Sequence, residues 1–587
     1  MKKLVAIIIS CIALAIGSSS CEDMMGSYLD KAPGIDVTED TVFSSTAHAE
    51  RFLATVYRYA VHSNLPYFTE GWEDPSNYDG TLSSGATDES ETCAAWYSTQ
   101  HWNSGSLTAD EIQDHRYKFR WIALRQIAIM IERIHDVPDI SSAYANQIIA
   151  EMKTLRALNY LEMMKRYGGV PIIDRRIDLG EDLKIPRASL QEVVSFILKD
   201  CQDAIDAPEL PEDQTGALKG RVGKGVALAI KAKTLLYAAS PLFNTDTPHL
   251  SLGANNNLIC LGGYNPELWK QAADASKAVL DWAAANGHQL ITDQGESNNY
   301  RYAWEVYDNP EIIFAEKAHG EIGTWDWPWS AISPPNIYPG NRGQSGITPT
   351  LNFVKKYEKR TGEDQYWDPD GGSDLQAKMG ELDYRFSQTI AYNKSIWNEE
   401  KGEMQIWEGG RDANTCHGGF WLHKHFPAKI NNTQSKLAPN STLFQLNEFY
   451  LSYAEALNEY YNGPTPEAYA AVKTIRDRSG QPPYPSGLDY EGFKKRIHRE
   501  RDIELAFDNH RLWDIMRWKE AETEGVMQGD MWGIKVYKID GNNDEFRYEP
   551  YVFEKRSFQK RMYLNPFPTS EINKGYLIQN QIGRAHV

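Results

Sequence analysis

Cysteine is scarce in this chain, with six cysteines spread over 587 residues. That number cannot supply the disulfide framework of a small secreted scaffold. No two cysteines are spaced closely enough in sequence for a zinc-thiolate or dithiol redox motif. Metal-thiolate and dithiol chemistry are therefore excluded as the expected function.

Positive charge is also in short supply. Lysine and arginine total 61 against 80 aspartates and glutamates, which gives a formal net charge of −19. A nucleic-acid-binding protein needs a concentrated basic face, so nucleic acid is excluded as the expected partner. The hydrophobic share of 41% and the aromatic share of 12% instead indicate a packed protein with an unusual supply of rings.

Motifs for catalysis are missing as well. The histidines, including His423 and His425, form no His-Glu-x-x-His pattern, and there is no Gly-x-Ser-x-Gly elbow. Residues 220–225 (GRVGKG) lack the Ser or Thr of a phosphate loop and predict a helix start. The oxygen-rich turns 368–374 and 540–544 lack the terminal bidentate Glu of an EF-hand. We predict no catalytic residue, no metal site and no cofactor.

Long apolar runs are absent after the amino terminus, so no later transmembrane span is expected. The chain begins with two lysines, a short apolar run and small residues before Cys21, an arrangement typical of a secretory signal with a lipobox. We predict a signal peptide over 1–20, a lipid on Cys21 and a tether over 21–34. Glu22 and Asp23 resemble the surface-export signal of Bacteroidetes lipoproteins, which indicates an outer-membrane protein facing the cell exterior.

Helical periodicity dominates the remaining sequence. Apolar residues recur at three- and four-residue steps over 148–161, residues 226–239 are nearly all apolar or small, and a helical face over 446–457 is followed across a Gly-Pro break by a second helical stretch. Such pairs are typical of tetratricopeptide-like units. We predict a mostly α fold with one helical region over 35–245 and another over 246–580. The second region contains a loop-rich, partly β insertion at 300–440, with a strand at 311–314.

Several longer motifs follow one another in order: 165–171 (KRYGGVP), 235–244 (LLYAASPLFN), 453–459 (YAEALNE), 500–507 (ERDIELAF) and 510–514 (HRLWD). Together they resemble the SusD/RagB family of outer-membrane nutrient-binding lipoproteins of Bacteroidetes. The resemblance implies a non-catalytic, glycan-binding, tetratricopeptide-like protein that caps a SusC-like TonB-dependent transporter. The end departs from the family: residues 582–587 (IGRAHV) match a translated sequencing adapter, and we predict that 581–587 are not native.

Two tryptophan-rich loop stretches are the expected ligand surface. Sugars stack on flat rings while carboxylates and amides bond their hydroxyls, and large rings in loops have no helical packing to explain them. An extended 325–329 segment would direct its three tryptophans to one side, although any single such ring is more often packed than ligand-binding. The candidate ligand-binding residues are Trp72, Asp88, Trp96, Tyr97, Trp102, Asn103, Trp325, Trp327 and Trp329.

Other rings and charges point to structural roles. Trp513 and Trp518 lie among apolar residues at helical spacing and are predicted to pack in the core. The charges in 500–504 are predicted to form an ion-pair network instead of an acid/base pair.

Two further functions stay open. A secreted glycosidase would use paired carboxylates such as Glu73 and Asp74, or Asp88 and Glu89, although sequence neighbours do not establish the separation needed across a sugar. A peptide-binding lipoprotein of a TonB-dependent importer would use the concave face of the helix pairs. The loop tryptophans favour sugar, but the sequence does not identify the glycan.

Overall fold

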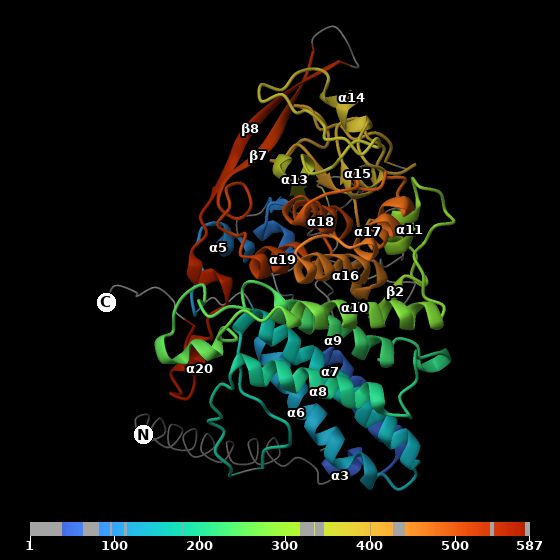
Figure 1. The fold of residues 1–587 in the computed structure, drawn as a ribbon, viewed down its shortest axis with the longest axis vertical. Coiled ribbons are helices and arrows are strands. Elements are labelled where there is room, and N and C mark those ends of the chain that lie inside the picture. The colour runs from blue at the N-terminus through green and yellow to red at the C-terminus, as the bar shows by residue number, and fades with distance from the viewer. Residues whose placement is uncertain are drawn as a thin grey trace, which may run out of the picture.

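The computed structural model describes residues 38–62, 82–93, 97–110, 114, 116–178, 180–316, 334, 346–399, 401–426, 441–539 and 545–580. Figure 1 shows a row of long helices in the lower and middle parts of the molecule, with short helices, loops and a long hairpin above them.

The row of helices links the two halves of the chain. It consists of α4 (Thr46–Ala60), α6 (Tyr117–Arg133), α7 (Ser142–Tyr167), α8 (Leu190–Asp206), α9 (Lys224–Ala239), α10 (Glu267–Ala285), α16 (Leu446–Tyr461), α17 (Pro466–Arg478) and α18 (Tyr490–Glu504). Each helix packs on the next in this order up to α17, and α18 packs on α16. The helices predicted at 148–161, 226–239 and 446–457 are confirmed.

Local sequence signals set the ends of these helices. The Ser189 side chain accepts from the Glu192 backbone N–H while Glu192 reaches back, forming a capping box at the start of α8. Gly168 follows α7 with φ = 74°, a left-handed conformation that favours glycine. The Thr465 side chain caps α17, whose first residue is Pro466.

Helix α9 lies inside the row. It packs against α7, α8, α10 and α16, and most of its residues are buried. A Cβ atom at Gly225 would lie 2.2 Å from the ring of Trp282 in α10, so only glycine allows this approach. The stretch 220–225 is therefore the turn before a helix, as predicted.

Short elements complete the described fold. The short helices are α3 (Glu39–Val42), α5 (Thr99–Asn103), α11 (Asn299–Glu305), α13 (Leu351–Val354), α14 (Leu375–Gly380), α15 (Tyr384–Thr389), α19 (Arg511–Trp518) and α20 (Thr569–Ile572). The strands form antiparallel pairs: β1 (Ser90–Thr92) with β3 (Ile347–Pro349), β2 (Ile312–Glu316) with β6 (Ser441–Gln445), β4 (Ile390–Ala391) with β5 (Trp421–Leu422), and β7 (Gly529–Lys538) with β8 (Phe546–Arg556). Strand β2 confirms the strand predicted at 311–314.

Two large apolar cores stabilise the part of the chain that the structure describes, in addition to a small cluster around Leu210. The larger one fills the row of helices. The smaller one joins insertion residues such as Leu351, Phe386 and Trp421 to Phe507 after α18 and Tyr548 of β8. The described part of the 300–440 region is thus packed against the carboxyl-terminal elements. Among the residues that the structure describes, no helix is both long and apolar enough to cross a bilayer.

The last described residues return to the amino-terminal half. Arg187, which is buried, donates from Nη1 to the carbonyl of Ile578 at 2.7 Å and to Oδ1 of Asn580 at 3.0 Å. Asn580 in turn donates to the carbonyl of Tyr167 at 3.1 Å. The segment after β8 therefore closes onto the end of α7.

Candidate ligand-binding site

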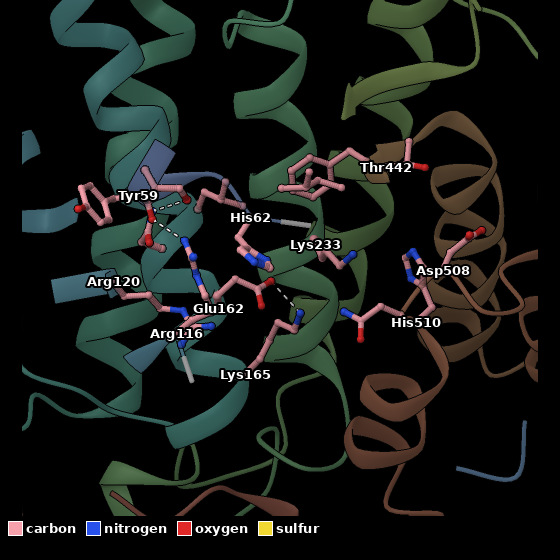
Figure 2. A pocket seen from close by; sticks show the side chains of 16 residues that line it. Tyr59, His62, Arg116, Arg120, Glu162, Lys165, Lys233, Thr442, Asp508 and His510 are labelled. Atoms are coloured by element: carbon pink, nitrogen blue, oxygen red, sulfur yellow. Dashed lines mark hydrogen bonds and ion pairs between the residues drawn. The ribbon is translucent and has the colours of Figure 1, made fainter. Parts of the chain in front are cut away.

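A narrow, charged pocket lies between the amino-terminal helices and two carboxyl-terminal segments. Its walls come from the end of α4, the start of α6, α7, α9, β6 and residues 508–510. Figure 2 shows the side chains of Arg116, Arg120, Glu162, Lys165, Lys233 and His510 around it. The volume of about 40 Å³ holds a few water molecules but no sugar ring.

Glu162 of α7 is the central anion of this pocket. Its carboxylate lies 2.8 Å from Lys165 Nζ and 2.5 Å from Arg166 Nη1. Burial opposes its ionisation, but Lys165 and Arg166 outweigh burial and hold the pKa of Glu162 well below its usual range. Burial, opposed by Glu162 and assisted by the nearby Lys233 and Arg166 cations, lowers the pKa of Lys165 to about 7.

Charged side chains on the opposite wall also pair with one another. Lys233 of α9 lies 2.8 Å from the Glu448 carboxylate, and His510 Nε2 lies 3.7 Å from the same carboxylate. Burial lowers the pKa of His510 to about 3, so this ring is neutral at pH 7. The Asp508 carboxylate pairs with Lys424 at 2.6 Å.

This arrangement suits the binding of water or one small polar group. Glu162 is held ionised by two cations, so it is a poor general acid. Among the described residues, no group of three or more His, Cys, Asp or Glu side chains could hold a metal ion. The pocket therefore offers hydrogen bonds and charge to a small polar group.

Two residues that line the pocket are close in sequence to stretches outside the described residues, one of which contains a tryptophan. His62 directly precedes 63–81, which contains Trp72, and Thr442 follows 427–440 closely. Both side chains line the pocket, and Figure 2 labels both. Sequence reasoning missed the pocket, for which the placement of Lys233 within the nearly apolar α9 was a signal.

Four of the predicted ligand-binding residues are corrected by the structure. Asp88, Tyr97, Trp102 and Asn103 are only 1–3% exposed. The Asp88 carboxylate pairs with Arg511 at 2.8 Å and with Lys356 at 2.7 Å. Asn103 donates to the carbonyl of Gly85 at 3.0 Å and to Glu91 Oε2 at 3.1 Å. These side chains are packed or paired within the protein, as most such groups are.

The other candidates, Trp72, Trp96, Trp325, Trp327 and Trp329, lie outside the described residues, as do Cys21 and the 581–587 tail. The described residues Cys93 and Gly346 lie side by side. The Cys93 N–H donates to the carbonyl of Gly346 at 3.4 Å, extending the β1 and β3 pair.

The structural interpretations of the other residues are confirmed. Trp513 and Trp518 are 3% and 7% exposed, and the Trp518 indole donates to Glu455 Oε1 at 2.8 Å. The charges in 500–504 are buried and paired. Burial lowers the pKa of both His423 and His425 to about 3, consistent with interior, uncharged rings.

Two family models match the chain in succession. The model described as starch-binding associating with outer membrane matches residues 27–236, and the model of the SusD family matches residues 310–582. SusD-like protein P38 of Formosa agariphila is 24% identical over 419 residues, which cover 68% of this chain and 71% of that protein.

Solved structures share the fold. A SusD-like protein from Bacteroides fragilis superimposes with a TM-score of 0.75 at 23% identity, covering 94% of this chain and 99% of its own. A laminarin-binding SusD-like protein gives a TM-score of 0.56 at 19% identity, covering 92% and 99%. The predicted tetratricopeptide-like helical fold is confirmed.

Proposed function

Because the chain belongs to the SusD/RagB family, we propose that it binds a glycan at the outer membrane and delivers it unmodified to a SusC-like TonB-dependent transporter. The observation that carries this proposal is the succession of two family models along the chain, one of them described by starch binding and outer-membrane association. A structural neighbour described as laminarin-binding supports the glycan as ligand.

The proposed sugar platform consists of the indoles Trp72, Trp96, Trp325, Trp327 and Trp329. The β1 and β3 pairing supports this choice, because it places Cys93, three residues before Trp96, beside Gly346, which follows the 325–329 segment in sequence. Indole faces bind pyranose rings by stacking, while neighbouring polar groups fix their orientation.

Affinity electrophoresis in gels containing laminarin or soluble starch tests this platform. We expect one polymer to retard the protein, and Trp96→Ala and Trp327→Ala each to weaken that binding about threefold to tenfold, since an aromatic contact contributes roughly 0.5–1.5 kcal/mol beyond area burial. Trp532→Ala is the matched control, because this ring is 37% exposed on the β7 strand. Parental binding by both loop variants would contradict the platform.

A glycosidase is disfavoured by the state of Asp88 and Glu89. Burial raises the pKa of Glu89 to about 8, whereas Arg511 and Lys356 outweigh burial and hold the pKa of Asp88 well below its usual range. An acid and a base with separated pKa values are what a glycosidase needs, but both carboxyls are 1% exposed and no sugar reaches them. Incubation with laminarin and starch should release no new reducing ends; turnover would refute a purely binding role.

The membrane anchor and the transporter are tested in cells. We expect Cys21→Ala to move the protein from the membrane fraction to the soluble fraction, because acyl chains anchor a protein only when attached. We also expect a TonB-dependent barrel to copurify with the detergent-solubilised parent. Membrane retention of the Cys21 variant would contradict the lipid anchor without affecting the glycan proposal.

A peptide is the alternative ligand, and one groove favours it. The groove between α10 and α16 has a volume of about 460 Å³ and is lined by Tyr453, Tyr460 and Tyr461 together with lysines and carboxylates. Tyr461 is 59% exposed. If the ligand is a peptide, Tyr461→Ala should weaken binding of a random peptide library, whereas Tyr366→Ala, which alters a ring 68% exposed elsewhere, should not.

A further inference from the structure

We propose that Cys93 and Cys416 form a disulfide that joins the end of β1 to the loop 406–418. Both are free thiols in the structure. The proposal rests on the export of the protein to an oxidising compartment, where disulfides form and persist. Their separation in sequence conceals the pair, because Thr415, the residue before Cys416, follows Cys93 by 322 positions.

The strand register places both sulfur atoms on one face of a ladder. In the β1 and β3 pair, Glu91 is opposite Thr348, and Cys93 is opposite Gly346 through the extending hydrogen bond. Because alternate residues share a face, the Cys93 side chain lies on the face of Thr348. Cys416 Sγ lies 4.0 Å from Thr348 Oγ1 on that face.

A second contact brings the two segments together directly. Cys93 Sγ donates to the carbonyl of Thr415 at 2.8 Å, and Thr415 immediately precedes Cys416. Cys416 Sγ is held by the carbonyl of Phe420 at 3.2 Å. The two thiols therefore lie among the same few residues, and closing the bond requires each to leave the carbonyl to which it donates.

The chemistry is a thiol–disulfide exchange. The thiolate of one cysteine attacks a sulfur of an external disulfide, either oxidised glutathione or the disulfide form of a thiol oxidoreductase, and a mixed disulfide forms. The second thiolate then displaces the external sulfur as the new S–S bond closes. The pair of cysteines loses two protons and two electrons, and the external disulfide leaves as two thiols.

The environment of the thiols favours closure while the protein folds. Burial raises the pKa of Cys93, and the neighbouring Cys416 adds to this effect; burial raises the pKa of Cys416 as well. Protonated thiols exchange slowly. We expect the folded, reduced protein to oxidise slowly at pH 7 and faster as the pH rises.

The bond would connect three parts of the molecule. Residues 94–96 continue directly from Cys93. The loop that carries Cys416 supports the hairpin, because the Gly418 carbonyl accepts from the Ile534 N–H at 3.0 Å and the His417 carbonyl accepts from the Tyr551 hydroxyl at 2.7 Å. The disulfide would thus fix the base of the Trp96 stretch relative to β7 and β8.

Thiol counting in the full chain is the first test. The protein is purified from its membrane without reductant, unfolded in iodoacetamide and digested. We expect Cys201 and Cys260 to be alkylated, and Cys93 and Cys416 to occur in one cross-linked peptide that reduction splits. Alkylation of all four cysteines would overturn the proposal. Glycan binding by the same sample reports on the proposed function separately.

Unfolding by urea is the second test. We expect Cys93→Ser, Cys416→Ser and the double variant to unfold at the same urea midpoint, below that of the parent. Dithiothreitol should lower the urea midpoint of the parent to this value and leave the midpoints of the variants unchanged. Cys260→Ser is the matched control: combined with the double variant, it should shift the urea midpoint by the same amount as it does in the parent. A parent midpoint that is insensitive to reductant would overturn the disulfide.

Discussion

Helices α7 and α18 are both buried along much of their length, but different interactions hold them. The interior face of α7 is mostly apolar, with Ile148, Met152, Leu155 and Leu161 fully buried. The carboxyl-terminal half of α18 is charged and equally buried, from Glu500 to Glu504. Helix α7 combines an apolar stripe with some buried ion pairs, whereas the end of α18 is held largely by ion pairs in several directions.

The charges of α18 reach several other elements. Glu500 pairs with Arg385 and Arg476 at 2.7 Å, and Arg501 pairs with Asp514 of α19 at 2.9 Å. Asp502 pairs with Arg511 and Lys356, both at 2.7 Å. This teaches that the charged 500–507 motif acts as a structural hub, with every buried charge compensated as its desolvation requires.

The largest effect on this comparison is expected from Glu504→Ala. The Glu504 carboxylate accepts from Arg385 at 2.8 Å, from Arg478, and from Asn447 Nδ2 at 2.8 Å. Its removal leaves buried guanidinium groups short of an anion, and we expect a loss of about 3–5 kcal/mol in the free energy of unfolding. Urea unfolding checks this value; a loss below about 1 kcal/mol would contradict the hub.

Leu155→Ala makes the matching change in α7. Leu155 is fully buried, so truncation removes apolar contacts and leaves a cavity, at a cost of about 2–5 kcal/mol. The control is Leu183→Ala, which alters a leucine that is 69% exposed and should change stability by less than about 0.5 kcal/mol. Equal losses in the two leucine variants would show that α7 is not held by its apolar stripe.

Glu89→Gln sharpens the comparison through pH, because Glu89 lies next to the end of α18 and accepts from the Phe507 N–H at 2.9 Å. Burial raises the pKa of this carboxyl from 4.5 to about 8. Between these values the unfolded chain releases a proton that the folded protein keeps, so this group lowers stability as pH rises. The free energy of unfolding of the variant should rise relative to that of the parent by up to about 1.4 kcal/mol per pH unit between pH 5 and 8. A constant difference across this range would mean that Glu89 is ionised in the folded protein.

The smallest effect is expected from Lys473→Ala on α17. Lys473 and Asp477 form an exposed pair one helical turn apart, with side chains 53% and 51% exposed. Such pairs contribute about 0.3–0.5 kcal/mol, and high salt should abolish the difference between variant and parent. A loss as large as that of Glu504→Ala would show that exposure does not separate the two kinds of ion pair.

The sequence predicted elements that follow a local rule. The apolar residues of helix α7 recur at the three- and four-residue steps of an amphipathic helix, and Trp513 and Trp518 lie among apolar residues with the same helical spacing. The expectation that Trp102 and Asp88 are exposed rested on loop location alone, whereas Trp102 packs in the larger apolar core and Asp88 is buried in a pair with the distant Arg511. The pocket around Glu162 and the approach of Cys93 to Cys416 depend on segments hundreds of positions apart, which no window of sequence contains.

The return of residues 578–580 to Arg187 has a consequence for synthesis on the ribosome. Arg187 also donates to the carbonyls of Gly169 and Tyr167, within its own half, but Ile578 and Asn580 are translated 391 and 393 positions after it. Until then, water occupies the place of these two acceptors at the guanidinium. Final consolidation of the amino-terminal half is therefore expected only after residues 578–580 have been made, even though its helices emerge first.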